Sequence, residues 1–164
     1  MIRPEIQHAH ISDRYAIAYI DQCAQVDAGK AQGSSDYIDP MFESAWEDRF
    51  TARSHSQGHR LIIVAKHFGI VIGFANSSYS DTQHCVVEAI GVADHYRNIG
   101  VGQILLNTVI NEIPEPKNSI AVEVPDHFNS SMAFFKRAGF ERADRQTRLN
   151  TRNSTRLELD LSRR

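Results

Sequence analysis

The hydrophobic positions in the first 51 residues predict one strand followed by two helices. Residues 2–10 alternate between apolar and polar positions, which is typical of a strand. A helix is expected after Ser12, and a second one after Asp39-Pro40, where aromatic residues recur every four positions. The turn-rich segment 27–36 between them predicts a mobile loop. The expected core-facing residues of the two helices are Tyr15, Ile17, Ala18, Ile20 and Ala24, then Phe42, Trp46 and Phe50.

The middle of the chain changes to a strand pattern. Short apolar runs at 61–65 and 70–75 flank the turn 67–69, which predicts a hairpin. A third strand is expected over 85–92, and a helix from Gly100 that ends before two prolines.

The last third repeats this alternation of strand and helix. A strand is expected at 120–124, a helix at 129–137 closed by Gly139, and two strands at about 140–148 and 154–161. The resulting order is β-α-α-β-β-β-α-β-α-β-β. Such an order predicts an α/β fold with a mixed central sheet and helices on both of its faces. A chain of 164 residues has the size of one domain, so we expect a single domain over 1–164.

Composition narrows the cellular context. No apolar run is long enough to span a bilayer and the N-terminus lacks a signal core, so we expect a cytoplasmic protein without a membrane partner. Cys23 and Cys85 have no metal or redox spacing and should be reduced. Residues 1–135 carry nine Lys/Arg against sixteen Asp/Glu, whereas 136–164 carry nine against four. The acidic body favours a cationic small molecule, and the net charge of −2 argues against a nucleic-acid partner.

The segment 86–102 contains the residues that indicate a ligand. A strand runs into a short loop, and Gly100 opens a helix whose first amides have no internal partner. Helix starts of this kind bind phosphate, Gly100 and Gly102 allow close approach, and Arg97 adds a cation. Gln103 stands where a P-loop needs lysine, and Leu105 stands where a dinucleotide fingerprint needs glycine. The segment therefore predicts a pyrophosphate site of another kind.

The segment resembles the GCN5-related N-acetyltransferase (GNAT) superfamily, whose motif [Q/R]-x-x-G-x-[G/A] is matched by Arg97, Gly100 and Gly102. Asn129 with the run 133–140 resembles the superfamily's later helix and strand. The resemblance implies an acyl-CoA N-acyltransferase fold over nearly the whole chain and acetyl-CoA as cosubstrate.

The resemblance also implies that the cofactor lies between two parallel strands, 86–92 and 120–124, that splay apart. We expect a bulge at Gly91 to start the splay. Backbone amides of the first strand would bind pantetheine, and amides of 98–102 would bind the pyrophosphate. The implied cofactor residues are Ile90, Gly91, Val92, Arg97, Asn98, Ile99, Gly100, Val101, Gly102, Asn129 and Phe135.

Two glutamates are candidates for the catalytic base. Glu88 would share a face with Ile90 and Val92 in the absence of a bulge, buried beside apolar neighbours. Glu123 lies mid-strand, where some members of the superfamily use a glutamate. Glu88 could instead be paired with a neighbouring side chain. Phe135 stands where many members have the tyrosine that protonates the leaving thiolate, so the acid is open.

The sequence thus predicts an N-acetyltransferase that moves an acetyl group to a primary amine, most simply that of a cationic small molecule. A protein N-terminus or lysine remains an alternative acceptor, and a non-catalytic acyl-CoA sensor remains an alternative of another class. We expect no metal ion, since the pairs His8/His10 and His55/His59 do not form a credible ligand set. A homodimer is compatible with the superfamily, and the sequence fixes neither the acceptor, the acyl length nor the oligomeric state.

Overall fold

The computed structural model describes residues 2–27, 39–51, 58–80, 84–114, 118–143 and 153–162. Its elements follow the predicted order, with short 3₁₀ turns before α1 and α3. The strands are β1 Glu5–His8, β2 Gly58–His67, β3 Ile70–Ser80, β4 His84–Val92, β5 Ser119–Pro125, β6 Glu141–Arg142 and β7 Ser154–Asp160. The helices are α1 Arg14–Asp27, α2 Pro40–Thr51, α3 Val101–Glu112 and α4 Asn129–Arg137.

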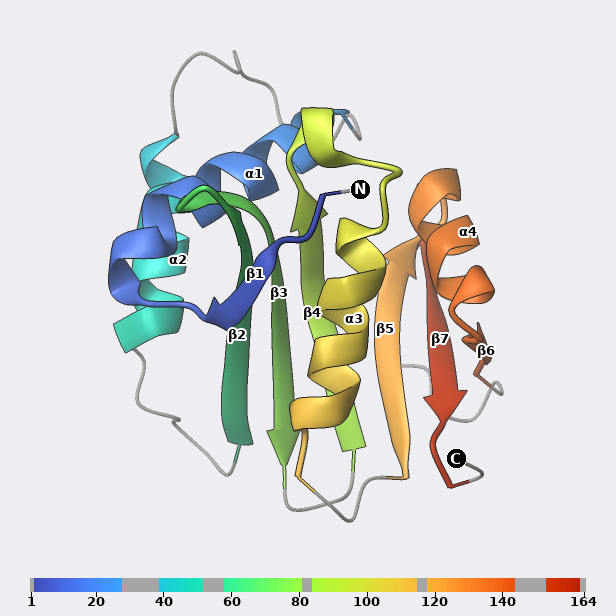
Figure 1. Cartoon of the computed structure of the whole chain (residues 1–164). Coiled ribbons are helices and arrows are strands. Elements are labelled where there is room, and N and C mark those ends of the chain that lie inside the picture. Colours follow the sequence, from blue (N-terminus) through green and yellow to red (C-terminus); the bar gives the residue numbers. More distant parts are fainter. Residues whose placement is uncertain are drawn as a thin grey trace.

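The strands form one seven-stranded sheet in the order β1-β2-β3-β4-β5-β7-β6. Every neighbouring pair is antiparallel except β4 and β5, which are parallel and are connected through α3. The predicted mixed sheet is therefore confirmed. The order also shows what the sequence did not: β7 inserts beside β5 and leaves the two-residue β6 at the edge (Figure 1).

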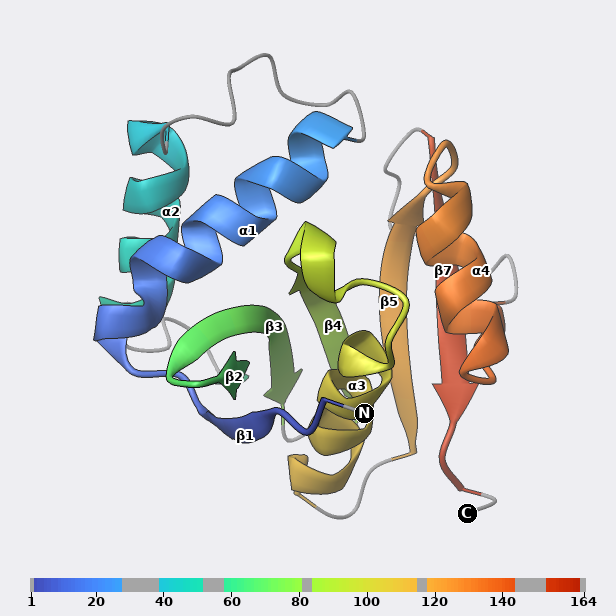
Figure 2. The ribbon, with the colours of Figure 1, turned by 45° about the horizontal axis from the view of Figure 1, so that its top comes forward.

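Two hydrophobic clusters lie on opposite faces of this sheet (Figure 1, Figure 2). The larger one is built by α3 and α4 with the sheet, around residues such as Leu105, Leu106 and Phe135. The smaller one lies under α1 and α2, where Trp46 packs edge-on against Phe74 with ring centroids 5.0 Å apart. Tyr15, expected in the stripe of the first helix, is instead 43% exposed, and the Arg14 guanidinium covers its ring.

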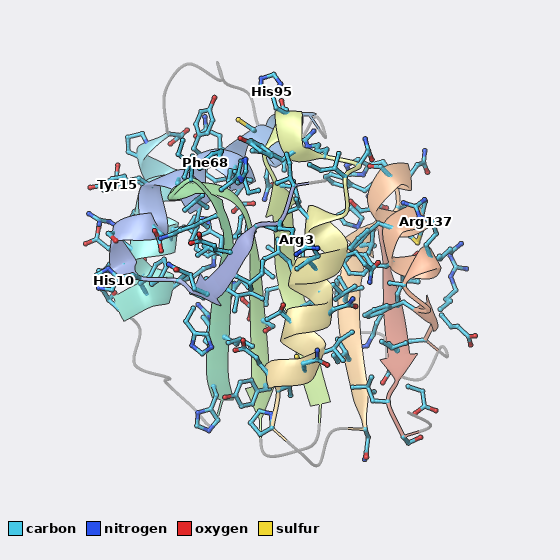
Figure 3. All side chains as sticks on the ribbon, in the orientation of Figure 1. Arg3, His10, Tyr15, Phe68, His95 and Arg137 are labelled. Atoms are coloured by element: carbon cyan, nitrogen blue, oxygen red, sulfur yellow. The ribbon has the colours of Figure 1, made fainter. Side chains whose placement is uncertain are left out.

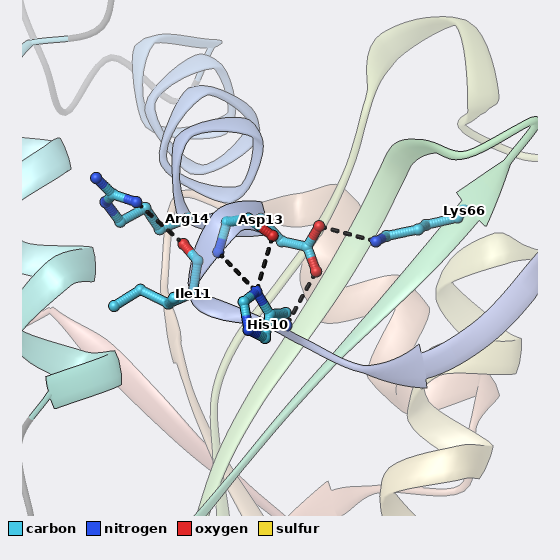
Figure 4. Close-up of polar contacts among 6 residues, drawn as sticks. His10, Ile11, Asp13, Arg14 and Lys66 are labelled. Atoms are coloured by element: carbon cyan, nitrogen blue, oxygen red, sulfur yellow. Dashed lines mark hydrogen bonds and ion pairs between the residues drawn. The ribbon is translucent and has the colours of Figure 1, made fainter.

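A buried carboxylate fixes the passage from β1 into α1 (Figure 4). Asp13 accepts a hydrogen bond from the backbone N–H of His10 at 3.0 Å and pairs with the Lys66 ammonium at 2.8 Å. Both side chains are largely shielded from water, so the pair connects the start of the helix to β2. The sheet thereby sets the position from which α1 crosses its face.

Local turn predictions agree with the backbone. The hairpin turn places Phe68 and Gly69 at φ of 50° and 77°, and Gly139 ends α4 at φ of 95°. The expected strand 140–148 is seen only as β6, because 144–152 lie outside the described residues, as do residues 28–36 of the predicted loop. Neither Cys23 nor Cys85 is part of a disulfide; Cys85 is buried and Cys23 is half-buried.

Candidate active site

The parallel strands β4 and β5 pair along only part of their length. Their register runs from His84↔Ser119 to Val87↔Val122 and stops there, although β4 continues to Val92. Beyond Val87, β4 remains paired with β3 on its other side. Within the described residues, the β5-facing edge of the second half of β4 therefore has no strand partner, as the expected splay requires.

A β-bulge lies at the point where the pairing stops. Val87 pairs with Ser77 and Ala89 pairs with Asn76, so Glu88 is an extra residue without a partner in β3. The bulge is at Glu88 and not at Gly91, which pairs regularly with Phe74. The prediction of a bulge at Gly91 is therefore wrong.

The bulge also changes the direction of Glu88. Ile90 and Val92 pack with the α3 cluster, whereas the Glu88 carboxylate accepts a hydrogen bond from the Asn76 side-chain amide at 2.8 Å. Asn76 has the same strand parity as Phe74, so this contact is on the face covered by α1 and α2. Glu88 therefore does not share a face with Ile90 and Val92. Nor is it buried: its side chain is 31% exposed and also lies 3.6 Å from the Arg60 guanidinium.

Close packing, and not the expected bulge, explains why residue 91 is a glycine. A Cβ at this position would lie 2.5 Å from the Phe74 ring and 3.0 Å from Ile20. The absent side chain lets α1 and Phe74 approach the splayed half of β4 closely. This contact keeps the half that lacks β5 attached to the rest of the sheet.

The loop after β4 shapes the start of α3. Gly100 is its N-cap at φ of 96° and, as a glycine, provides no side chain to cap the helix. Asn98 adopts φ of 61°, the left-handed geometry that asparagine tolerates. Arg97 donates from Nε to the Val92 carbonyl at 3.0 Å and pairs with Asp94 at 2.7 Å. Arg97 thus ties the loop to β4, in addition to lending it charge.

A cleft of about 790 Å³ opens between the splayed half of β4, the start of α3 and one side of α4. Most of its lining comes from the end of β4, the start of α3 and α4; Figure 1 shows α3 and α4 on either side of β5. Nine of the eleven predicted cofactor residues line it: Ile90, Gly91, Val92, Arg97, Asn98, Gly100, Gly102, Asn129 and Phe135. Of the other two, the Val101 side chain is buried in the core under α3, and Ile99 is 48% exposed outside the lining.

Several lining residues were not among the predicted site residues. Tyr96 and Gln103 border the phosphate loop, and most of the rest lie on α4 or just before it. Helical spacing would have found only Ser131, which lies four positions before Phe135 and so shares its face; Ser130, Phe134 and Arg137 do not have this spacing from Asn129 or Phe135. The unpredicted lining residues are Ala24, Tyr96, Gln103, His127, Phe128, Ser130, Ser131, Phe134 and Arg137.

The second motif fits less closely than the first. Its alanine should follow the asparagine by three positions, where this chain has Met132, and Ala133 comes one residue later. The helix begins at Asn129, with Phe128 as an N-cap that makes no side-chain cap. Phe135 is 6% exposed, packs against Phe134 and Phe140, and offers no polar atom to the cleft.

Glu123 has a partner that accounts for a charge in a central strand. It lies directly opposite Arg156 of β7, with 3.4 Å between carboxylate and guanidinium, and Ser154 donates to it at 3.3 Å. Neither Glu123 nor Glu88 lines the described cleft. The two candidate bases therefore differ: Glu88 lies where the strands part, and Glu123 is in a cross-strand ion pair.

Two further observations concern the described residues only. No helix there is long and apolar enough to cross a membrane. No three His, Cys, Asp or Glu side chains in these ranges are grouped as they would be around a metal ion.

Several solved structures share the architecture of this chain. The PaiA N-acetyltransferase of Thermoplasma acidophilum, solved with coenzyme A, is 14% identical with a TM-score of 0.68, over 97% of this chain and 99% of that one. YncA of Salmonella typhimurium, solved with its cofactor acetyl-CoA, is 17% identical with a TM-score of 0.67, over 98% and 95%. The ribosomal-protein-alanine N-acetyltransferase of Brucella melitensis is 21% identical with a TM-score of 0.68, over 96% and 99%.

Sequence comparison gives the assignment. No curated protein matches the chain. The family model described as the acetyltransferase (GNAT) family matches residues 30–140, which is well over half of the sequence. These residues include the bulge at Glu88, the start of α3 and all of α4. The chain therefore belongs to the GNAT acetyltransferase family.

Proposed function

We propose that this protein transfers an acetyl group from acetyl-CoA to a primary amine of a small cationic molecule. The observation that carries the proposal is the cleft at the β4–β5 opening, where a strand edge without a partner meets an uncapped helix start. These features provide backbone donors for an elongated ligand with an anionic end. The CoA complexes of two structural relatives support acetyl-CoA as that ligand.

The proposal assigns one wall of the cleft to the pyrophosphate and another to the pantetheine arm of the cofactor. The amides of 98–102 would hold the pyrophosphate, and Gly100 leaves open space where a Cβ would project. The amides near Ile90 and Val92 would pair with the pantetheine arm as a partial strand. Asn129 would contact that arm from the α4 side.

The reaction needs one bond formed and one broken. The neutral amine nitrogen attacks the thioester carbonyl carbon, the C–N bond forms, and the C–S bond then breaks with its electron pair leaving on sulfur. The nitrogen loses a proton to a base, and a backbone amide near Val92 would stabilise the oxyanion. We assign the base to Glu88, acting directly or through water.

Three contacts support Glu88 over Glu123. The bulge places Glu88 where the two strands part, on the α1/α2 face, so a base on one side can meet a thioester arriving from the other. Asn76, only 1% exposed, holds the Glu88 carboxylate by a charge-assisted hydrogen bond. Each glutamate has an arginine nearby, Arg60 at 3.6 Å from Glu88 and Arg156 at 3.4 Å from Glu123, but Glu123 lies in the regular β5–β7 ladder, away from the point where the strands part. The acidic composition of residues 1–135 supports a cationic acceptor approaching over α1 and α2.

Supplying acetyl-CoA with a panel of polyamines, aminoglycosides, amino-acid derivatives and short peptides, and detecting released thiol, tests this proposal. Turnover with a small polyamine or aminoglycoside but not with peptides supports it. Turnover only with peptide N-termini or lysines favours the alternative of a protein acceptor. Acetyl-CoA binding without turnover on any amine favours a non-catalytic sensor, for which Phe135 in place of an acid is the specific argument.

The proposal also covers the domain organisation, the cellular location and the metal requirement of the enzyme. It includes a single domain over 1–164, a cytoplasmic location and chemistry without a metal ion, all supported by composition and by the absence of a metal-type cysteine or histidine spacing in the sequence. A homodimer is compatible with it.

A further inference from the structure

Glu88 and Glu123 are the first residues beyond the paired part of the two parallel strands. The register of β4 and β5 ends at Val87↔Val122, so one glutamate follows on each strand. The residues on both sides of Glu123 in β5 pack in the α3/α4 cluster, so its side chain points to the opposite face of the sheet. The Glu88 carboxylate is bound to Asn76 on that same opposite face. The two carboxylates therefore share one face, at the point where the strands part.

This face is the one that α1 and α2 cover in part, and it is not the face of the α3/α4 cluster. Figure 3 labels Tyr15 on α1 and Arg137 on α4, the helices of the two opposite faces. The side chains of Glu88 and Glu123 are 31% and 32% exposed, so a solute can reach both. Neighbouring strands are about 4.8 Å apart, so one small molecule can contact both carboxylates at once.

An arginine flanks each glutamate on its outer side. Arg60 of β2 lies 3.6 Å from the Glu88 carboxylate, and Arg156 of β7 lies 3.4 Å from the Glu123 carboxylate. Both distances are longer than those of a charge-assisted hydrogen bond, which are about 2.7–2.9 Å, so each carboxylate keeps acceptor capacity for a ligand. From β2 to β7 the charges follow the order positive, negative, negative, positive. A cation is therefore bound best between the two glutamates.

Asn76 adds a buried acceptor beside Glu88. The residue is 1% exposed, and its Nδ2 donates to the Glu88 carboxylate at 2.8 Å. An ionised carboxylate only accepts hydrogen bonds, which fixes the orientation of the amide. Among the described residues, Asn76 Oδ1 has no hydrogen-bond partner, and it is bonded to the same carbon as Nδ2. Buried polar atoms are nearly always paired, so this oxygen is suited to a ligand that brings donors, and a primary ammonium has three.

We propose that the acceptor is a linear diamine, with its reacting amine at Glu88 and Asn76 and its far ammonium at Glu123. Glu123 then determines which amines are used and is not the base. The near amine takes the acetyl group in the proposed reaction, whereas the far amine keeps its proton and is not modified. Carboxylates on adjacent strands match two amines joined by a chain of about four carbons. The inference rests on the proposed function, because it assumes acetyl transfer to an amine at Glu88.

The order of the charges favours a cation over an anion at the far end of the acceptor. An acceptor that extends from Glu88 toward β7 meets Glu123 before it reaches Arg156. A carboxylate at that position would be repelled by Glu123, whereas an ammonium would be attracted. The acidic composition of residues 1–135 acts in the same direction.

Three acceptors with the same four-carbon chain test the inference: 1,4-diaminobutane, 1-aminobutane and 4-aminobutanoate. Their far ends carry a cation, no charge and an anion. Steady-state kcat and KM are measured for each with the whole protein at saturating acetyl-CoA and low ionic strength. We expect kcat/KM for the diamine to be about 5- to 20-fold above that for 1-aminobutane, through a lower KM, because the far ammonium gains a charge-assisted contact that solvent partly screens. 4-Aminobutanoate should be the poorest acceptor of the three.

Glu123→Gln should remove this preference. We expect it to raise KM for the diamine about 5- to 20-fold, and to leave KM for 1-aminobutane within about two-fold and kcat for both within about three-fold. A merely structural role of Glu123 would change both amines alike. Glu158→Gln is the matched control, because Glu158 is a partly exposed carboxylate on the same face of β7 as Arg156. It should leave the ratio between the two amines unchanged.

The outcomes separate this inference from the proposed function. Equal kcat/KM for the diamine and 1-aminobutane would overturn the inference, and so would an equal change of KM for both in Glu123→Gln. A loss of preference in Glu158→Gln equal to that in Glu123→Gln, or a preference for 4-aminobutanoate, would overturn it as well. If none of the three reacts but another small cation does, the inference fails and the proposed function stands. If no amine reacts, both fail. Thermal melting of each variant shows that it is folded.

Discussion

The two halves of β4 behave as different structures although they belong to one strand. The first half, His84–Val87, is paired with β5, and from Cys85 onward also with β3, and it contributes the buried Cys85 and Val87 to the core. The second half, after the bulge at Glu88, has β3 on one edge and the cleft on the other. One half therefore serves stability, and in the proposed function the other presents backbone donors to the cofactor.

The comparison shows that one extra residue separates the paired half of β4 from the half that borders the cleft. One extra residue ends the parallel pairing region and re-aims a carboxylate toward Asn76. Because Gly91 has no side chain, the second half of β4 packs closely against the Phe74 ring. If the division is correct, substitutions in either half can lower the free energy of unfolding, but only those in the second half should also change turnover or cofactor binding.

The largest effect is expected from Glu88→Gln. Losing a general base typically lowers kcat by about 10²- to 10⁴-fold, whereas the isosteric amide leaves the cleft itself unchanged. Steady-state kinetics with the amine identified in the panel measures kcat, and titration with acetyl-CoA shows whether the cleft still binds the cofactor. A kcat within about two-fold of the wild type across the pH range would remove Glu88 from the mechanism.

Gly91→Ala tests the second half through packing. Its new methyl group would overlap the Phe74 ring, which is part of a fully buried cluster, so we expect a loss of about 1–3 kcal/mol in the free energy of unfolding. Chemical denaturation measures this value. Phe74→Leu in the same background should recover part of the loss by making room. A variant as stable as the wild type would mean that α1 is not tightly packed on this half.

Val87→Ala is the corresponding test of the first half. Val87 is 1% exposed, so removing two methyl groups should cost about 1–3 kcal/mol in the free energy of unfolding. The residue is outside the cleft, and the KM for acetyl-CoA should stay within about two-fold of the wild type. A KM increase much beyond that, in a variant that remains folded at the assay temperature, would contradict the division of β4 into two functions.

Sequence reasoning recovered what local patterns encode. Strand alternation, helix periodicity and the glycines at 100 and 139 placed the elements close to their observed bounds, because each depends on nearby residues. The family motif located nine lining residues for the same reason: Arg97, Gly100 and Gly102 act within one loop and one helix turn.

What the sequence missed depends on contacts between distant segments. The bulge position follows from the register of β4 against β3, and a strand pattern cannot show which residue is skipped. The reason for Gly91 lies in Phe74 and Ile20. The cleft wall on α4 required the packing of Phe134 beside Gly102, so Arg137 could not be recognised from its own neighbourhood.

The smallest effect is expected from Glu123→Gln, which separates the two glutamates. Glu123 faces Arg156 across β5 and β7, but its side chain is 32% exposed, so solvent screens the pair. Neutralising it should cost about 1 kcal/mol or less in the free energy of unfolding. Because Glu123 lies outside the cleft, kcat should fall by less than about three-fold, far less than for Glu88→Gln. Denaturation and the same kinetic assay measure both values. A loss of kcat comparable to that of Glu88→Gln would transfer the base to β5 and with it the argument for a protein acceptor.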